Sequence, residues 1–150
     1  MRFVHNIIVR VFIKPEEDSL SAKKGLVSLF PFSLEDEKIA VQEQTATGFN
    51  ERPIKILMAT LTKENHTRRF LEHLLQRLNN EQKELLVREA EVRLDSELYF
   101  FIRIDKDILL NEQRYFITNS GNCYHIKMAI AAFPAKREAA LAVVEKIFAL

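Results

Sequence analysis

Hydrophobic and polar side chains alternate along several short segments of the chain, and elsewhere the apolar side chains recur at helical spacing. Strands are expected at residues 4–13, 39–45, 54–61 and 98–104, where side chains alternate or β-branched and other apolar residues are frequent. In residues 64–78 the large apolar side chains fall on one stripe, as in an amphipathic helix. A second helix is expected at residues 81–94, after Asn79 and Asn80. The pattern predicts a fold that mixes strands with helices.

Proline and acidic residues mark the remaining helices. Pro15 is followed by three acidic residues and predicts the start of a helix that runs to about Phe30, because acids favour the positive end of the helix dipole. Residues 105–112 have the length of one or two helical turns, and Pro134 predicts the start of a last helix. We therefore expect helices between most of the strands.

The sequence Asn-Ser-Gly-Asn at residues 119–122 is a strong turn signal. It predicts a hairpin between strands at residues 114–118 and 123–131. The predicted order of elements is then β-α-β-β-α-α-β-(short α)-β-β-α. Mixed order with hairpins is typical of the α+β class, so we expect a single domain with a mostly antiparallel mixed sheet and helices packed on one face. The other sheet face would be partly open, which suits a binding surface.

The composition is that of an ordinary soluble domain, with 150 residues that are 47% hydrophobic and 29% charged. The one cysteine, Cys123, excludes an internal disulfide framework and a zinc site built from several cysteines, so a cytoplasmic location is expected. The N-terminal segment predicts a strand rather than a signal peptide, and no apolar run reaches the roughly eighteen residues of a membrane span. We expect no cofactor, no metal and no membrane association.

The formal net charge is only +1, but the charges are segregated along the chain. Residues 52–71 hold five bases and one acid, a balance of +4, and residues 113–137 hold four bases and no acid. Residues 81–112 hold nine acids and five bases, a balance of −4. These segments predict one positive and one negative face, and the alternative is that folding intermixes them.

The acid-free segment 113–137 combines cationic, amide and aromatic side chains, which together suit a phosphate backbone with exposed bases. Its candidate contacts are Arg114, Tyr115, Asn119, Asn122, His125, Lys127, Lys136 and Arg137. Lys136 and Arg137 fall in the first turn of the last predicted helix, where cations oppose the helix dipole. A bound phosphate would resolve this conflict, and pairing with Glu138 or another acid is the alternative.

The predicted helix at residues 64–78 carries a row of potential cations. His66, Arg69, His73 and Arg77 fall within roughly 80° of arc, away from the apolar stripe. Such a row suits a phosphate track, in which arginine supplies bidentate contacts, and the alternative is a solvated helix face. A metal site from His66 and His73 is disfavoured, because no carboxylate or cysteine joins them.

The predicted strand at residues 98–104 places Tyr99, Phe101 and Arg103 on one face. Aromatic side chains beside an arginine can stack on bases, as in RNA-binding modules. The run lacks the glycines of the RRM signature, so it does not identify that module. The alternatives are core packing and a dimer contact.

Catalytic signatures are absent from the sequence. No nucleotide-binding glycine loop, zinc-protease motif or nucleophile elbow is found. Cys123 and His125 alternate on one strand, but no third group orients the histidine as a base. A small hydrolase that uses His66, His73 or His125 stays an alternative, and it requires these histidines to converge in a pocket.

Three segments resemble one family: HNIIVRVFIKPEED (5–18), FFIRIDK (100–106) and YFITNSGNCYHIKMAIAAFPAKREAAL (115–141). They are similar to archaeal predicted RNA-binding proteins of the exosome-subunit-like kind, over nearly the whole chain. The resemblance implies a fold similar to ribosomal protein L5. It also implies RNA binding, with a link to RNA processing or ribosome-related functions, and it carries no catalytic motif.

The sequence therefore predicts a non-catalytic RNA-binding protein. The expected RNA contacts are Arg52, Arg68, Arg69, His73, Arg77, Tyr99, Arg103, Arg114, Tyr115, Asn119, Asn122, His125, Lys127, Lys136 and Arg137. About six phosphate contacts would give a log–log salt slope of around −5. The expected partners are structured RNA and exosome or ribosome-related proteins. The alternative is a homodimer or accessory subunit of an RNA-processing complex that does not touch RNA.

Overall fold

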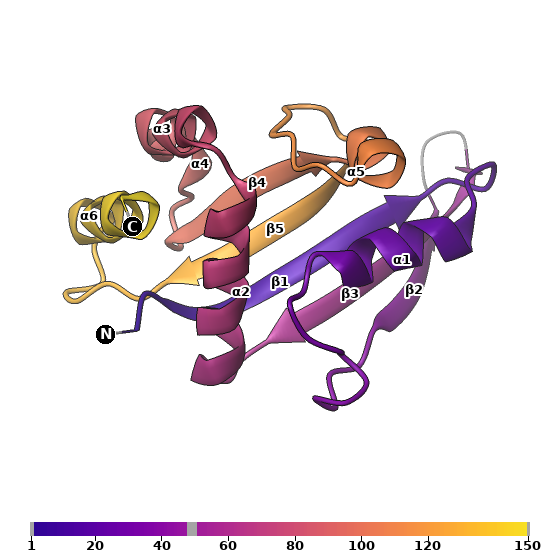
Figure 1. Cartoon of the computed structure of the whole chain (residues 1–150), viewed down its shortest axis with the longest axis horizontal. Coiled ribbons are helices and arrows are strands. Elements are labelled where there is room, and N and C mark those ends of the chain that lie inside the picture. Colours follow the sequence, from indigo (N-terminus) through magenta and orange to yellow (C-terminus); the bar gives the residue numbers. More distant parts are fainter. Residues whose placement is uncertain (1, 48–50, 150) are drawn as a thin grey trace. The chain divides into compact units, whose positions relative to one another are not determined.

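The computed structural model describes residues 2–47 and 51–149. In this part of the chain the elements are β1 (Val4–Ile13), α1 (Ser19–Ser28), β2 (Gln42–Thr47), β3 (Pro53–Leu61), α2 (Glu64–Arg77), α3 (Asn80–Arg88), α4 (Ala90–Arg93), β4 (Tyr99–Asp105), α5 (Lys106–Glu112), β5 (Cys123–Ile130) and α6 (Arg137–Phe148). The strands form one antiparallel sheet in the order β2-β3-β1-β5-β4 (Figure 1). The predicted α+β class is confirmed. None of the helices described is both long and apolar enough to cross a bilayer.

The chain divides into two compact units. The first, here called the terminal unit, comprises Met1–Ile7, Leu61–Ile102 and Lys127–Leu150. The second, the central unit, comprises Ile8–Thr60 and Arg103–Ile126. Helices α2, α3, α4 and α6 belong to the terminal unit, and helices α1 and α5 belong to the central unit. Each unit therefore has its own helices and its own buried side chains.

The terminal unit is built on the apolar stripe of α2, which the sequence predicts correctly. Phe70 and Leu74 on this stripe are each only 1% exposed. Phe100 of β4 is completely buried, and its ring centroid lies 5.8 Å from that of Phe148 in α6. Burial of a large apolar side chain contributes about 1.5–3 kcal/mol. These contacts fix which face of β4 lies against α6.

A capping box separates α2 from α3. The backbone N–H of Gln82 donates to Asn79 Oδ1 at 2.8 Å, and the backbone N–H of Asn79 donates to Gln82 Oε1 at 2.9 Å. These two bonds satisfy amide groups that the first turn of a helix otherwise leaves unpaired. The one helix predicted at residues 81–94 is instead two helices, since α3 ends at Arg88 and α4 begins at Ala90.

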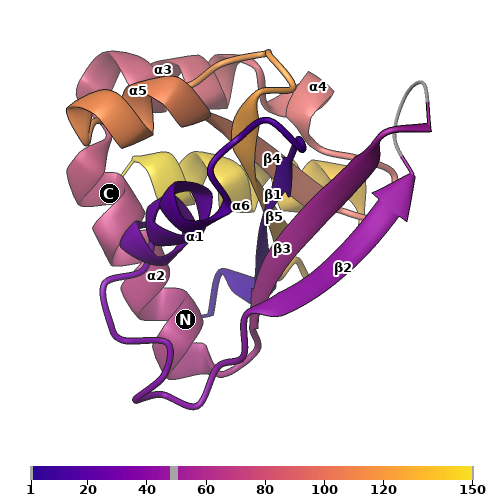
Figure 2. The ribbon, with the colours of Figure 1, turned by 90° about the vertical axis from the view of Figure 1, so that its right-hand side faces the viewer.

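In the central unit, α1 and α5 contact each other and lie to one side of the β2–β3 hairpin (Figure 2). The hydroxyl of Tyr124 in β5 donates to the carbonyl of Ala22 in α1 at 2.8 Å. Lys106 is only 3% exposed, and its Nζ donates to the carbonyl of Phe12 at 2.7 Å and pairs with Glu17 at 3.1 Å. These bonds satisfy polar groups that burial would otherwise destabilise.

The first helix begins later than the sequence predicts. Asp18 is its N-cap, because Asp18 Oδ1 accepts a hydrogen bond from the backbone N–H of Leu20 at 3.0 Å. Helix α1 therefore starts at Ser19 rather than at Pro15. The acidic side chain of Glu17, expected in the first helical turn, is instead the partner of buried Lys106.

The hairpin predicted between residues 114–118 and 123–131 is wrong. Residues 116–118 pair with the end of β4, where Ile117 bridges Ile104 and the N–H of Thr118 donates to the carbonyl of Arg103 at 2.9 Å. The turn signal correctly locates the bend of the chain at residues 119–122. It does not identify the pairing partner, because tertiary packing decides which strand lies beside which.

Candidate nucleic-acid interface

The side chains of β4 alternate between two environments. Phe100 and Ile102 are fully buried, whereas Tyr99 and Phe101 are half-exposed. Because successive side chains of a strand point to opposite faces of the sheet, the two half-exposed rings point away from the helix that covers Phe100. In the terminal unit, β4 thus presents two aromatic rings on the sheet face opposite α6.

Lys127 of β5 lies over these two rings. Its Nζ atom is 4.2 Å from the ring centroid of Tyr99 and 5.8 Å from that of Phe101. A cation at this distance from a partly exposed ring is stabilised by about 0.5–1 kcal/mol. Aromatic rings beside a mobile positive charge are what proteins use to stack bases and hold phosphates of single strands. Tyr99, Phe101 and Lys127 are called the sheet cluster below.

The central unit also pairs arginines with aromatic rings. The guanidinium carbon of Arg10 lies 5.5 Å from the ring centroid of Phe12, and that of Arg114 lies 5.8 Å from that of Phe116. The two phenylalanines are 40% and 42% exposed. Arg10 and Phe12 are not among the contacts expected from sequence, although the alternation in residues 4–13 places both on the less buried side of the strand.

The turn at residues 119–122 keeps its predicted polar side chains at the surface. Arg103 Nη1 donates to the backbone carbonyl of Asn119 at 3.1 Å, and Asn122 Nδ2 donates to Asp107 Oδ2 at 3.0 Å. Arg103 and Asn119 are exposed, and Asn122 is half-exposed. The structure therefore brings together Arg103 and Asn119, which the sequence analysis selected from separate segments.

Three of the predicted cationic contacts form ion pairs with acids. The pairs are Arg52 with Glu16, Arg68 with Glu72 at 3.8 Å, and Arg114 with Glu112 at 3.1 Å. All six side chains are at least half exposed, and exposed ion pairs contribute only about 0–1 kcal/mol. A phosphate can therefore compete for each of these arginines at small cost. That the basic segments share one face stays a prediction.

Arg137 contacts the end of α4. Its Nη1 donates to the carbonyl of Leu94 at 2.9 Å, and its Nη2 donates to the carbonyl of Glu91. A cation is favourable at the negative end of a helix, so these carbonyls offset the unfavourable position of Arg137 at the start of α6. For Arg137, backbone carbonyls thus take the place that the sequence assigned to an acid or a phosphate, and a phosphate contact of Lys136 and Arg137 stays a prediction. Lys136 is the exposed N-cap residue of α6.

Two predicted contacts are buried. Tyr115 is 3% exposed and His125 is 9% exposed, so neither presents a surface to a ligand. Tyr115 is buried because Ile117, two residues further, pairs with β4, and alternate residues of an extended segment share a face. His125 lies on β5 between buried neighbours. We therefore leave both residues out of the interface.

The row of cations predicted on α2 is only partly realised. His66 is 5% exposed and belongs to the buried stripe of the helix. Burial, and secondarily the positive charge of Arg77, lowers the pKa of His73, so this imidazole is neutral near pH 7. Arg69 is half-buried and Arg77 is exposed. His73 thus adds no positive charge to this helix near pH 7, and His66 is not at its surface.

Two observations concern the candidate metal ligands and the cysteine. Among residues 2–47 and 51–149, no group of three or more His, Cys, Asp and Glu side chains is arranged to hold a metal ion. Burial raises the pKa of the Cys123 thiol, which keeps it protonated and makes it a poor nucleophile.

Comparisons with known proteins agree on one family. A family model named RNA_binding, described as RNA binding, matches residues 6–132. The chain is 29% identical over 143 residues to "RNA-binding protein PAB1135" of Pyrococcus abyssi, which covers 95% of this chain and 92% of that protein.

Solved structures of similar proteins have the same fold. Protein AF2318 from Archaeglobus fulgidus matches with a TM-score of 0.87 and 25% identity, over 96% of this chain and 99% of that one. Mth689 from Methanothermobacter thermautotrophicus matches with a TM-score of 0.78 and 26% identity, over 97% and 98%. Both are described as DUF54 proteins.

Proposed function

We propose that this chain, which belongs to the RNA_binding family, is a non-catalytic RNA-binding protein that uses the sheet cluster to hold unpaired nucleotides. The family description and the name of the Pyrococcus relative support RNA as the ligand. The observation that carries the proposal is the position of Lys127, 4.2 Å from the ring centroid of Tyr99 on the sheet face opposite α6.

Binding would exchange one contact of Lys127 for another. The ammonium group now covers the ring of Tyr99, at a gain of about 0.5–1 kcal/mol. When a base stacks on this ring, the flexible lysine side chain turns to the adjoining phosphate, where it makes a charge-assisted contact. Stacking of one base contributes about 1–3 kcal/mol, which exceeds the cation–ring contact that is lost.

Arginines outside the sheet cluster would strengthen binding without reading the sequence. Arg52 and Arg114 sit in exposed ion pairs that a phosphate can replace. Such contacts release counterions from the RNA and position it. Structured RNA with unpaired loops satisfies both requirements, since its paired stems offer phosphates and its loops offer bases.

Substitutions in the sheet cluster test this function. We expect Tyr99→Leu and Lys127→Gln each to weaken binding of a hairpin RNA with an unpaired loop by about tenfold, measured by fluorescence anisotropy. Lys146→Gln, at an exposed position of α6, is the matched control and should bind as the wild type does. Equal affinities of all three variants, with unchanged melting temperatures, would exclude the sheet cluster as the interface.

We further propose an accessory role in RNA processing or in a ribosome-related step. Its support is the resemblance of residues 5–18, 100–106 and 115–141 to the exosome-subunit-like family. Ultraviolet crosslinking in cells followed by sequencing of the attached RNA tests it, with enrichment of ribosomal or precursor transcripts as the expected result. Recovery of unrelated transcripts in proportion to their abundance would contradict this role.

Exposed apolar side chains favour one second candidate, a protein–protein contact. Phe133 is 99% exposed and Val92 is 85% exposed, both in the terminal unit. In the segments that suggested a partner from sequence, Phe100 and Ile147 are 0% exposed and add no contact surface. Tyr99 and Phe101 of β4 are half-exposed. Size-exclusion chromatography of the wild type and Phe133→Ser tests this candidate. An RNA-independent oligomer that the substitution dissociates would support it, and monomers in both samples would not.

A further inference from the structure

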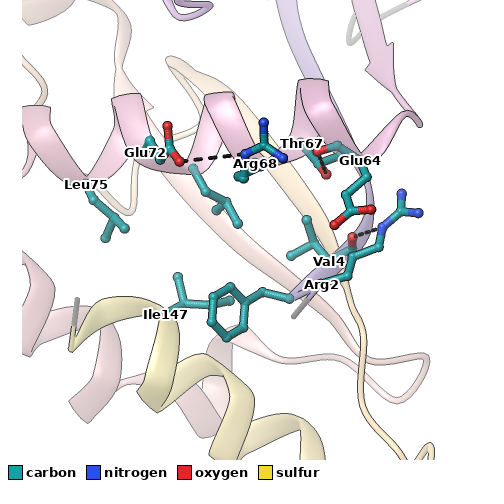
Figure 3. A pocket seen from close by; sticks show the side chains of 10 residues that line it. Arg2, Val4, Glu64, Thr67, Arg68, Glu72, Leu75 and Ile147 are labelled. Carbon is teal, nitrogen blue, oxygen red and sulfur yellow. Dashed lines mark hydrogen bonds and ion pairs between the residues drawn. The ribbon is translucent and has the colours of Figure 1, made fainter.

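A cavity of about 200 Å³ opens in the terminal unit between α2, the start of β1 and α6 (Figure 3). Its floor is apolar: Val4, Leu71 and Ile147 line it, and they are 1%, 6% and 0% exposed. Leu75 of α2 and Phe3 add apolar surface. Pockets for drug-sized ligands usually measure about 300–1,000 Å³, so this cavity has room for one planar ring system rather than a larger ligand.

Charged groups of both signs line the rim of the cavity. Arg2, Arg68, Glu64 and Glu72 all contribute to the lining, and their formal charges cancel. An isolated phosphate therefore gains little from the net charge here. A group that both donates and accepts hydrogen bonds gains more, because donors and acceptors lie around the same opening.

The two arginines at the rim are held differently. Arg2 donates to backbone carbonyls, at 2.9 Å to Val4 and at 2.7 Å to both His5 and Thr62, so it is fixed in place. Arg68 has two exposed side-chain contacts: its Nη2 donates to Asn65 Oδ1 at 3.2 Å, and its Nε lies 3.8 Å from Glu72 Oε1. Arg68 and Glu72 can therefore turn toward a ligand at small cost, because exposed ion pairs contribute little to stability.

We propose that this cavity receives the guanine base of one unpaired nucleotide of a bound RNA. Guanine carries acceptors at O6 and N7 that suit arginine, and an amino group at N2 that suits a carboxylate. The apolar floor covers the flat faces of the base. A paired base cannot enter such a cavity, whereas bases in bulges and loops can leave the stack. The inference rests on the proposed RNA binding and adds a base preference at a place separate from the sheet cluster.

Hairpin RNAs that differ at one bulged nucleotide test this inference. We expect the wild type to bind a hairpin with a bulged guanosine about tenfold more tightly than the same hairpin with a bulged adenosine or with no bulge. Arg68→Gln and Leu75→Phe, which fills the cavity, should abolish that preference. Arg88→Gln, at an exposed position of α3, is the matched control and should keep it.

The outcomes separate this inference from the proposed function. Equal affinity of the wild type for all three hairpins overturns the guanine site and leaves RNA binding in place. An equal loss for all three hairpins in Arg68→Gln assigns that arginine to phosphate alone and also overturns it. If no RNA binds, titration with guanosine monophosphate followed by methyl NMR decides the site. Shifts at Leu71, Leu75 and Ile147 that adenosine monophosphate does not cause are the expected result, and their absence overturns the inference.

Discussion

Gly25 shows how a single side chain position controls packing in the central unit. It lies in α1 against Tyr124, whose ring is completely buried and whose hydroxyl donates to Ala22. A Cβ atom at Gly25 would lie 2.7 Å from Tyr124 Cζ and 2.9 Å from Leu110 Cδ2. The tyrosine cannot move away without losing its hydrogen bond, so the missing side chain is what allows α1 to approach β5 and α5.

Gly25→Ala should therefore destabilise the protein although alanine favours helices. Alanine gains about 1 kcal/mol in helix propensity, and overpacking costs about 1–3 kcal/mol. We expect a net loss of up to about 2 kcal/mol in the free energy of unfolding, measured by denaturant titration. The loss should shrink when Tyr124→Phe removes the obstructing hydroxyl. Lys24→Ala is the control at an exposed neighbouring position, and a Gly25→Ala variant as stable as this control contradicts the packing argument.

His73 should make stability depend on pH. Burial, with the charge of Arg77, lowers its pKa in the folded state below the value of 6.5 expected for an exposed imidazole. The unfolded chain therefore binds a proton at His73 more readily than the folded chain does. The contribution of His73 to the free energy of unfolding is complete above pH 6.5 and is lost as the pH falls through the lowered pKa. We expect the stability advantage of the wild type over His73→Gln to be larger at about pH 7.5 than at about pH 5. A difference in melting temperature between the two proteins that stays constant over this pH range would contradict this prediction.

At the scale of elements, periodic patterns predicted most of the fold. Residues 4–13 and 64–78 carry strong alternation and a strong apolar stripe, and they became β1 and α2 almost unchanged. The errors arose where a contact distant in sequence decides the outcome. Residues 116–118 pair with β4 rather than with β5, and Glu17 leaves the predicted helix for Lys106. No local pattern contains this information.

The capping box at the start of α3 should contribute measurably to stability. Asn79→Ala removes the side-chain acceptor for the backbone N–H of Gln82, and the backbone N–H of Asn79 loses an ordered partner. Loss of such a cap costs about 1 kcal/mol. Asn80→Ala, one residue further and inside the helix, is the control. In thermal denaturation, the melting temperature should be lower for Asn79→Ala only. Equal melting temperatures of the two variants would refute the role of the cap.

The candidate interface was predictable in its residue types but not in its arrangement. Tyr99 and Lys127 were both selected from sequence, because an aromatic strand face and a lysine in an acid-free segment suit RNA. Their contact depends on β4 and β5 being neighbours in the sheet, which is a tertiary property. The burial of Tyr115 and the bond from Arg2 to the carbonyl of Thr62 depend on tertiary contacts in the same way.

At the scale of the whole molecule, a net charge of +1 gives little general attraction for a polyanion. In the proposed function, affinity for RNA comes from local groups instead: a lysine on aromatic rings, and exposed arginines that exchange a carboxylate for a phosphate. The resemblance to ribosomal protein L5 stays a prediction. In the proposed mode of binding, Lys127 contacts a phosphate while Tyr99 stacks on a base.

The salt dependence of RNA affinity tests that claim most directly. Dissociation constants of the wild type, Lys127→Gln and Tyr99→Leu should be measured between about 50 mM and about 200 mM salt. We expect the wild type to bind more weakly at higher salt, and the log–log slope to be smaller in magnitude by about 0.7–0.9 in Lys127→Gln. Tyr99→Leu should bind more weakly with an unchanged slope. Affinity independent of salt, or equal slopes for the wild type and Lys127→Gln, would contradict it.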